Sequence, residues 1–223
     1  MKITWLGHAC FLFEGTKTVI IDPFVPEGKV GIKPDIVALT HSHADHFGET
    51  LSLNVKTVAI NEIARYLTAK GLNAEGMNIG GTIEVDGVSF TMTPAVHSNW
   101  LEMGGEGYCG GCAAGFVIRM DGISIYHAGD TALFSDMKLI RDLYRPDVAL
   151  LPIGGRFTMG PKEAMMAANF IGAKVVIPMH YNTWPIIEQD AGMFKSSIER
   201  TTDIEVRILK PGEGTVVESV TYD

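Results

Sequence analysis

The residues best suited to chemistry stand close together before position 50. They form the run His41-Ser-His43-Ala-Asp45-His46, which follows the apolar stretch 35–40. Apolar residues without alternation are typical of a strand buried on both faces. Because strand side chains two apart face the same side, His41 and His43 are expected to point at one metal ion. A helix after them would turn Asp45 and His46 toward a second ion, and such ligands suit zinc, manganese or iron.

A single histidine at a strand end is more often an ordinary polar residue than a metal ligand. Three histidines and an aspartate within six positions argue against that reading, because each polar group needs a partner once it is buried. Further candidates follow other expected strands, namely His97, Asp130 and His180. In open α/β sheets, ligands bind beyond the carboxyl ends of the strands, so we expect these strand ends to converge on one edge.

The order of these residues resembles the metal signature of the metallo-β-lactamase superfamily, and the match spans residues 22–180. The resemblance implies two divalent metal ions per chain, zinc first and manganese or iron as alternatives. It assigns the ligands as follows: His41, His43 and His97 for the first metal, Asp45, His46 and His180 for the second, and Asp130 as the bridge. Asp22, in Ile-Ile-Asp-Pro, matches the aspartate that orients this motif by hydrogen bonding.

Two further segments resemble one branch of the superfamily. They are Leu6-Gly7-His8-Ala9 and the segment 157–161, and the branch comprises small stand-alone hydrolases akin to the ascorbate-phosphate lactonases. The resemblance implies that a hydroxide bridging the two metals cleaves an ester, lactone or phosphodiester bond of a small substrate. Asp45, as the carboxylate nearest that hydroxide, and His8 are the catalytic candidates.

The expected fold is an α/β sandwich formed by one domain over residues 1–223. Short strands and helices alternate along the chain after an opening meander. Asp86-Gly87 and Asp121-Gly122 predict tight hairpins, and helices are expected at 62–70, 133–143, 161–170 and 188–199. The family resemblance makes this pattern a four-layer αββα sandwich, in which two mixed sheets carry helices on their outer faces.

Several residues have weaker signals. His127 is expected behind the metal ligands or in packing, and Arg156, Thr158 and Trp100 are candidates for substrate binding. Cys109-Gly-Gly-Cys112 lacks the second cysteine pair of a zinc ribbon, so the glycine-dense stretch 104–115 is predicted to be a flexible loop near the site.

Composition narrows the partners and the location. The formal net charge of −8 argues against a nucleic-acid substrate, because binding to phosphate backbones needs clustered Lys and Arg. The start of the chain lacks a leader-like apolar run, no run is long enough for a bilayer, and the three cysteines are an odd number. We therefore expect a cytoplasmic protein with a small-molecule substrate and no membrane partner, and the resemblance is compatible with homo-oligomers. Two alternatives stay open: a non-catalytic metal-binding or scaffold protein, and a nuclease or phosphodiesterase that acts on nucleic acid.

Overall fold

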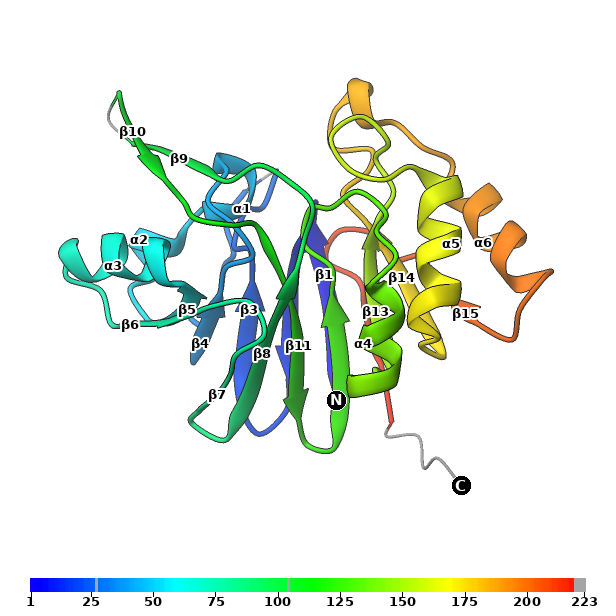
Figure 1. Cartoon of the computed structure of the whole chain (residues 1–223), viewed down its shortest axis with the longest axis horizontal. Coiled ribbons are helices and arrows are strands. Elements are labelled where there is room, and N and C mark those ends of the chain that lie inside the picture. The colour runs from blue at the N-terminus through cyan, green and yellow to red at the C-terminus, as the bar shows by residue number, and fades with distance from the viewer. Residues whose placement is uncertain (27, 104, 219–223) are drawn as a thin grey trace.

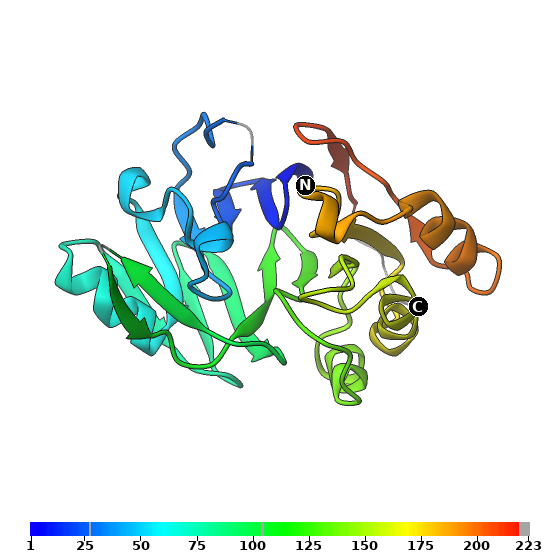
Figure 2. The ribbon, with the colours of Figure 1, turned by 90° about the horizontal axis from the view of Figure 1, so that it is seen from above.

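The computed structural model describes residues 1–26, 28–103 and 105–218 of the chain. Two seven-stranded sheets face one another across the main hydrophobic core, and helices lie along their sides (Figure 1). Figure 2 shows helix α4 (Met137–Tyr144) on the face of the second sheet that is turned away from the first. The α/β sandwich with two mixed sheets that the sequence predicts is confirmed.

The first sheet joins an antiparallel half to a parallel half. Its order is β16-β1-β2-β3-β4-β5-β6, in which β3 to β6 run parallel and the remaining neighbours antiparallel. Its strands are β1 (Lys2–Gly7), β2 (Cys10–Glu14), β3 (Thr18–Ile21), β4 (Ile36–Ala38), β5 (Lys56–Ile60), β6 (Ala74–Met77) and β16 (Gly214–Val216).

The second sheet follows the same plan. Its order is β15-β14-β13-β12-β11-β8-β7, with β12 to β15 parallel and the others antiparallel. Its strands are β7 (Thr82–Val85), β8 (Val88–Pro94), β11 (Ala114–Met120), β12 (Ile123–His127), β13 (Val148–Pro152), β14 (Val175–Met179) and β15 (Glu205–Val206). A separate hairpin consists of β9 (Trp100–Met103) and β10 (Glu106–Cys109).

Both predicted Asp-Gly hairpins are present, between β7 and β8 and between β11 and β12. Asp86 and Asp121 have φ of 50° and 53°, and the glycines after them have φ of 86° and 76°. Positive φ at both central residues is what a two-residue turn of the I′ type needs, and Asp-Gly tolerates it.

The helices are short and mostly lie where the sequence predicts them. They are α1 (Ala44–Phe47), α2 (Thr50–Leu53), α3 (Asn61–Ala69), α4, α5 (Pro161–Ile171) and α6 (Ala191–Glu199), with a 3-10 turn at Pro185–Ile187. Helix α4 starts at Met137, later than expected, and the residues before it have no regular structure, with the backbone N–H of Ala132 donating to the carbonyl of Val96. None of the helices in the described ranges is long and apolar enough to cross a membrane.

Strand β2 is covered on both of its faces. Phe11 and Phe13 point into the core between the sheets, whereas Cys10 and Leu12 belong to a second cluster with Val30. Successive strand residues alternate between the two faces, so an uninterrupted apolar run requires two covered faces. The second cluster provides the cover on the outer side of the first sheet.

The glycine-dense stretch 104–115 is not the flexible loop that the sequence predicts, because β10 occupies its first part and β11 its last. Gly104 itself lies outside the described residues. The indole of Trp100 fills the space beside Gly107, where an added Cβ would come within 2.0 Å of the ring. At this position glycine makes room for a tryptophan instead of providing flexibility.

Candidate metal centre

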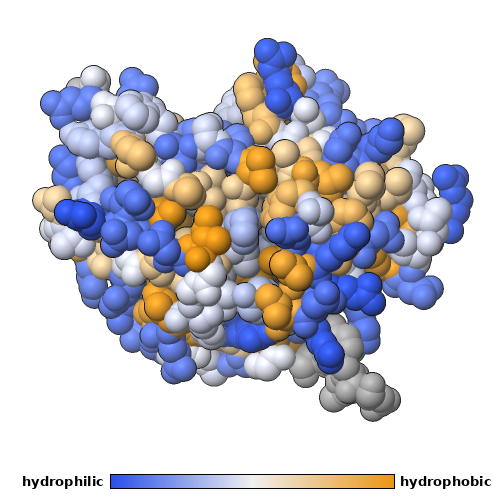
Figure 3. Space-filling model, viewed as in Figure 1, coloured by the Kyte–Doolittle hydropathy of each residue, from blue (hydrophilic) through white to orange (hydrophobic). Residues whose placement is uncertain are grey.

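Strand ends from both sheets bring the predicted ligands to one edge of the sandwich. Each ligand segment follows a strand: His41 and His43 after β4, with Asp45 and His46 on the adjoining α1, His97 after β8, Asp130 after β12, and His180 after β14. Figure 3 shows the molecule hollowed at its upper edge, between the side of the β9–β10 hairpin and the side of α5. The convergence predicted from the sequence is therefore present.

Asp130 is buried in the middle of this cluster. Its Oδ2 lies 3.0 Å from Nε2 of His180, 3.3 Å from Nε2 of His46 and 3.6 Å from Nε2 of His97. Gly129 before it has φ of 62°, and an added Cβ would come within 2.4 Å of a carbonyl oxygen at the start of β11. Only glycine fits there, and the resulting backbone path lets one carboxylate reach histidines from several segments.

We call Asp45, His46 and His180 the tethered half-site, because hydrogen bonds hold the His46 ring and the His180 backbone. Nδ1 of His46 lies 2.8 Å from Oδ2 of Asp22. Asp22 also accepts hydrogen bonds from the backbone N–H and the hydroxyl of Thr40, at 2.8 and 2.7 Å. A carboxylate behind a ligating histidine fixes its tautomer and turns the other nitrogen toward the metal. Asp22 thus takes the orienting position that the sequence predicts.

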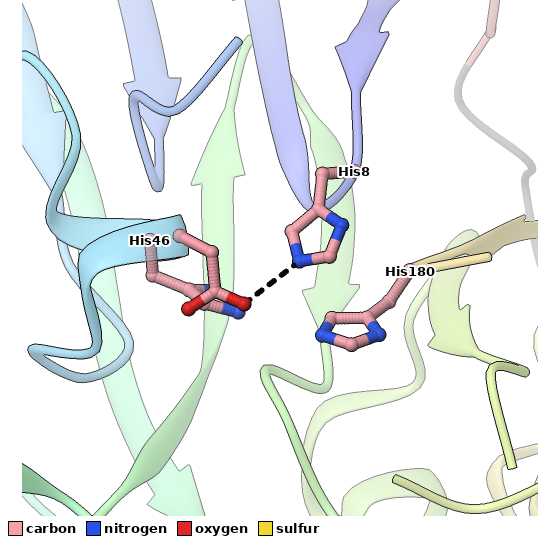
Figure 4. Close-up of side chains that lie close together, drawn as sticks. His8, His46 and His180 are labelled. Carbon is pink, nitrogen blue, oxygen red and sulfur yellow. Dashed lines mark hydrogen bonds and ion pairs between the residues drawn. The ribbon is translucent and has the colours of Figure 1, made fainter. Parts of the chain in front are cut away.

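His8 lies beside the tethered half-site, at the turn between β1 and β2. Its Nε2 is 3.2 Å from Oδ2 of Asp45, and its Nδ1 is 2.8 Å from the hydroxyl of Thr183. Its backbone oxygen accepts a hydrogen bond from the N–H of His180 at 2.9 Å. Figure 4 shows the imidazoles of His8, His46 and His180 directed toward a common space, although they come from three separate segments.

We call His41, His43 and His97 the open half-site, because the last two of these side chains are only partly buried. Nδ1 of His43 is 3.0 Å from Nε2 of His41 and 3.3 Å from Nε2 of His97. Behind these rings, Nδ1 of His41 lies 3.0 Å from the hydroxyl of Thr40, and Nε2 of His43 lies 3.4 Å from the hydroxyl of Ser98. The hydrogen bonds and ion pairs of the described residues include no carboxylate behind these rings that would correspond to Asp22 behind His46.

Unpaired buried atoms show that the cluster fits metal ions. Nε2 of His46 and Nε2 of His180 are shielded from solvent and have Oδ2 of Asp130 as their neighbour, at 3.3 and 3.0 Å, without the geometry of a hydrogen bond. Oδ1 of Asp130 has no hydrogen-bond partner among the described residues. Buried polar atoms in proteins are nearly always paired, since leaving one unpaired is costly. The ligand atoms of each half-site also lie within 4.8 Å of one another. Divalent ions would satisfy these atoms, so the donor set fits a metal centre.

Charge and burial set the protonation of the cluster. Burial opposes protonation of His46, but the carboxylates of Asp130 and Asp22 outweigh it and raise its pKa well above the usual value. Burial would also raise the pKa of Asp130, but His46 and His180 hold that pKa well below its usual range. Burial lowers the pKa of His8 to about 4, so this imidazole is neutral at pH 7. Binding of a metal ion at His46 must therefore release a proton.

Comparison with known proteins agrees with this geometry. A family model described as a β-lactamase superfamily domain matches residues 2–180, the stretch that contains every ligand of both half-sites. The chain belongs to this superfamily. A UPF0173 metal-dependent hydrolase of Methanoculleus marisnigri is 66% identical over 217 residues, with 97% of each chain covered. Another of Methanoregula boonei is 64% identical over 214 residues, with 96% of each chain covered. The protein is a metal-dependent hydrolase of the superfamily, as the sequence predicts.

Solved structures agree with this assignment. Igni18, a metallo hydrolase of Ignicoccus hospitalis, superposes with a TM-score of 0.89 at 38% identity, covering 97% of this chain and 98% of its own. An isothiocyanate hydrolase from Delia radicum gut bacteria has a TM-score of 0.78 at 17% identity, covering 99% of this chain and 100% of its own. At so low an identity the second comparison shows the common fold alone.

His127 of the hydrolase has a packing role. Its Nε2 donates to the carbonyl of Ala9 at 2.9 Å, and its Nδ1 accepts from the N–H of Gly129 at 3.1 Å. Both ring nitrogens are thus used in fixing the backbone around β12. Of the two roles that the sequence leaves open for His127, these contacts favour packing, since His127 holds the backbone of Gly129, the residue before Asp130.

The three substrate-binding candidates lie in different environments. Trp100 is 52% exposed on the hairpin, and the exposed Arg156 places its guanidinium 5.7 Å from the ring centre of Phe157. Thr158 is buried, and its hydroxyl donates to the carbonyl of Met159. Trp100 and Arg156 therefore present side chains to solvent, whereas Thr158 offers only its backbone. Their role in substrate binding remains a prediction.

The CxxC pair takes no part in the centre. Cys109 and Cys112 are free and exposed. Neither belongs to any group of metal-ligating side chains found in the described part of the chain. The spacing of two cysteines therefore predicts nothing about metal binding here.

Sequence reasoning misses residues that hold the ligands in place. Asn99 accepts hydrogen bonds from the backbone N–H and hydroxyl of Ser42, at 2.9 and 2.6 Å, and donates to the carbonyl of Gly110. It thereby ties the histidine segment to the hairpin. Thr183 and Trp184 hold the ring of His8. The Thr183 hydroxyl lies 2.8 Å from its Nδ1, and the Trp184 ring centre lies 4.9 Å from its ring centre. Only the neighbouring Pro-Met-His180-Tyr-Asn segment could have drawn attention to them.

Proposed function

We propose that this hydrolase cleaves an ester, lactone or phosphodiester bond of a small substrate, by means of a hydroxide shared between two divalent metal ions. The buried ligand atoms of His46, His180 and Asp130 support the proposal most strongly, because they crowd together without well-formed hydrogen bonds and metal ions would satisfy them. Asp130 Oδ2 lies close to His46 and His180 of one half-site and to His97 of the other, which supports two ions. Zinc is the first candidate, and the same imidazole and carboxylate donors suit manganese or iron.

Two bound ions would lower the pKa of a shared water toward neutrality and polarise the bond under attack. The protein's own part is to fix the ligands and to manage charge. Burial works against ionisation of Asp45, but the hydrogen bond with His8 and nearby histidines lower its pKa to about 2. Asp45 is therefore anionic at pH 7, which favours a ligand role and leaves its carboxylate able to accept a hydrogen bond from the attacking water.

The surroundings of the centre support a small substrate. Trp184 is 39% exposed and its ring centre lies 4.9 Å from that of His8, so an apolar ring beside the ligands is available to a substrate. Trp100 and Phe157 are each 52% exposed. Arg156 offers a positive charge to an anionic group of the substrate. The formal net charge of −8 disfavours nucleic acid. We keep the cytoplasm as the proposed location, with no membrane partner, and association into homo-oligomers as part of the proposal.

The test is a hydrolysis panel on purified protein reconstituted with zinc, manganese or ferrous iron. The panel contains aryl esters, lactones, bis(p-nitrophenyl) phosphate and a single-stranded oligonucleotide. We expect turnover of at least one small substrate, its loss in Asp45→Ala, and its retention in Asp203→Ala. Asp203 is a matched control because it is an exposed aspartate just before β15, outside both half-sites.

The other outcomes would replace this proposal. Full metal loading without turnover of any substrate would favour the metal-binding or scaffold alternative. Cleavage of the oligonucleotide, with none of the small esters or lactones, would favour the nuclease alternative.

A further inference from the structure

His8 stands outside the ligand set that the family resemblance assigns, yet the structure places it among the ligands. Its side chain is fully buried, and its Nε2 belongs to one compact group of ligand atoms with Asp45, His46 and His180. A buried imidazole that faces two others and a carboxylate is an unusual choice for packing alone. Packing therefore does not explain why His8 Nε2 lies among the ligand atoms of Asp45, His46 and His180.

The backbone of His8 is held in an uncommon conformation. His8 has φ of 52° and His180 has φ of 55°, both in the left-handed region that residues with side chains rarely adopt. The carbonyl of His8 accepts hydrogen bonds from the indole N–H of Trp5 at 3.0 Å and from the N–H of His180 at 2.9 Å. Strained residues that their surroundings hold this firmly are concentrated at functional sites. The bonds also fix His8 relative to His180.

The ring of His8 is oriented as a ligand would be. In this structure Nε2–H donates to the Asp45 carboxylate at 3.2 Å, and Nδ1 accepts from the Thr183 hydroxyl at 2.8 Å. As a ligand, His8 would instead carry its proton on Nδ1 and donate it to the Thr183 hydroxyl, which would free Nε2 for the ion. The ring centres of His8 and His180 are 4.0 Å apart. A ligating histidine usually has its second nitrogen bonded to an oxygen, which sets the tautomer of the ligating one. Thr183 stands in this position.

We propose that His8 is an additional ligand of the tethered half-site and makes this half-site bind its ion more tightly than the open half-site does. The inference rests on the dinuclear centre of the proposed function. With Asp130 shared, His8 gives the tethered half-site one more terminal ligand than the open half-site has.

The experiment is a stepwise titration of the apoprotein with Co²⁺ against a competing chelator, followed by visible absorption. We expect wild-type protein to bind cobalt in two steps of different affinity. In His8→Ala the tighter step should weaken by at least about tenfold, the lower limit for residues that merely orient ligands. The absorption band of the first equivalent should also change, and the weaker step should stay as it is.

A matched pair of variants tests the same inference if His8→Ala does not fold. Thr183→Val removes the hydroxyl that orients His8 and should weaken the tighter step, whereas Thr183→Ser keeps the hydroxyl and should leave that step intact. An unchanged first step and spectrum in His8→Ala, or equal weakening by Thr183→Val and Thr183→Ser, would overturn the inference. Because cobalt binding needs no turnover, these results are independent of whether the protein hydrolyses any of the panel substrates.

Discussion

The tethered and open half-sites use similar side chains but are supported differently. In the tethered half-site, Asp22 holds the ring of His46 at 2.8 Å, and the backbone of His180 is bonded to His8. In the open half-site, the partly exposed His43 has the Ser98 hydroxyl at 3.4 Å behind it. Both half-sites meet at Asp130. The difference between the half-sites therefore lies in the hydrogen bonds behind the ligands and not in burial alone, since the Asp45 side chain is 30% exposed and that of His97 is 12% exposed.

Removal of the shared carboxylate should have the largest effect, because it affects both half-sites. In Asp130→Ala we expect metal affinity to fall by more than about 100-fold, the upper limit for residues that only orient ligands, and turnover to be lost. Elemental analysis after dialysis and the hydrolysis panel measure this. Asp142→Ala, an exposed aspartate on α4, is the control. Retention of both ions in Asp130→Ala would show that Asp130 does not bridge.

Replacement of Asp22 should lower the metal affinity of the tethered half-site more than that of the open half-site. In Asp22→Asn the affinity of one metal should fall by about 10- to 100-fold, because the amide keeps only one acceptor oxygen for the three donors of His46 and Thr40 and carries no negative charge behind the His46 ring. Asp35→Asn is a closely matched control, since Asp35 also accepts from the N–H and hydroxyl of a threonine, Thr18, but at an exposed position. Chelator competition measures both steps, and equal losses in the two variants would contradict the comparison.

Loss of the Ser98 hydroxyl should have a small effect. A contact of 3.4 Å at an exposed position is a weak hydrogen bond. In Ser98→Ala we therefore expect the weaker metal-binding step to change by less than about threefold, near the lower limit for one hydrogen bond. The same chelator competition applies. A change as large as that of Asp22→Asn would mean that the open half-site depends on its surroundings as strongly as the tethered one.

Replacement of the cysteine pair should have the smallest effect. In Cys109→Ser/Cys112→Ser we expect unchanged metal content and unchanged turnover, because the two thiols are exposed and outside the ligand groups. Elemental analysis of the double variant checks this. Loss of one metal ion per chain would instead assign the cysteines to the centre and would break the division into two half-sites.

The ligands could be predicted from the sequence because their spacing is a local pattern. The Asp-Gly pairs had to form tight turns. The strand expected over 35–40 ends at Ala38, so His41 and His43 lie in the segment between β4 and α1, and they come together without the strand alternation from which they were predicted. The supports of the ligands could not be predicted in this way. Thr183 meets His8 across 175 positions of the chain, and Asn99 meets Ser42 across 57. Such contacts arise from tertiary packing, and a threonine or an asparagine has no pattern that marks it.

The β9–β10 hairpin was missed for a related reason. A run rich in glycine favours a loop when each glycine is considered alone. Gly107 is instead required by the Trp100 ring, and Gly110 by the close pair of Ser42 and Asn99, where an added Cβ would come within 2.4 Å of both side chains. Whether glycine indicates flexibility or close packing depends on its neighbours in space. The strand β6 (Ala74–Met77) was missed because its residues lack an alternating apolar pattern.

The number of metal ions per chain tests the central claim most directly. Native mass spectrometry of the reconstituted protein, with the intact chain and zinc as the added metal, measures it without any assumption about the substrate. The account predicts a species with two zinc ions, which reverts to a single ion or none in Asp130→Ala. A wild-type protein that binds only one ion at saturating zinc would contradict the dinuclear centre.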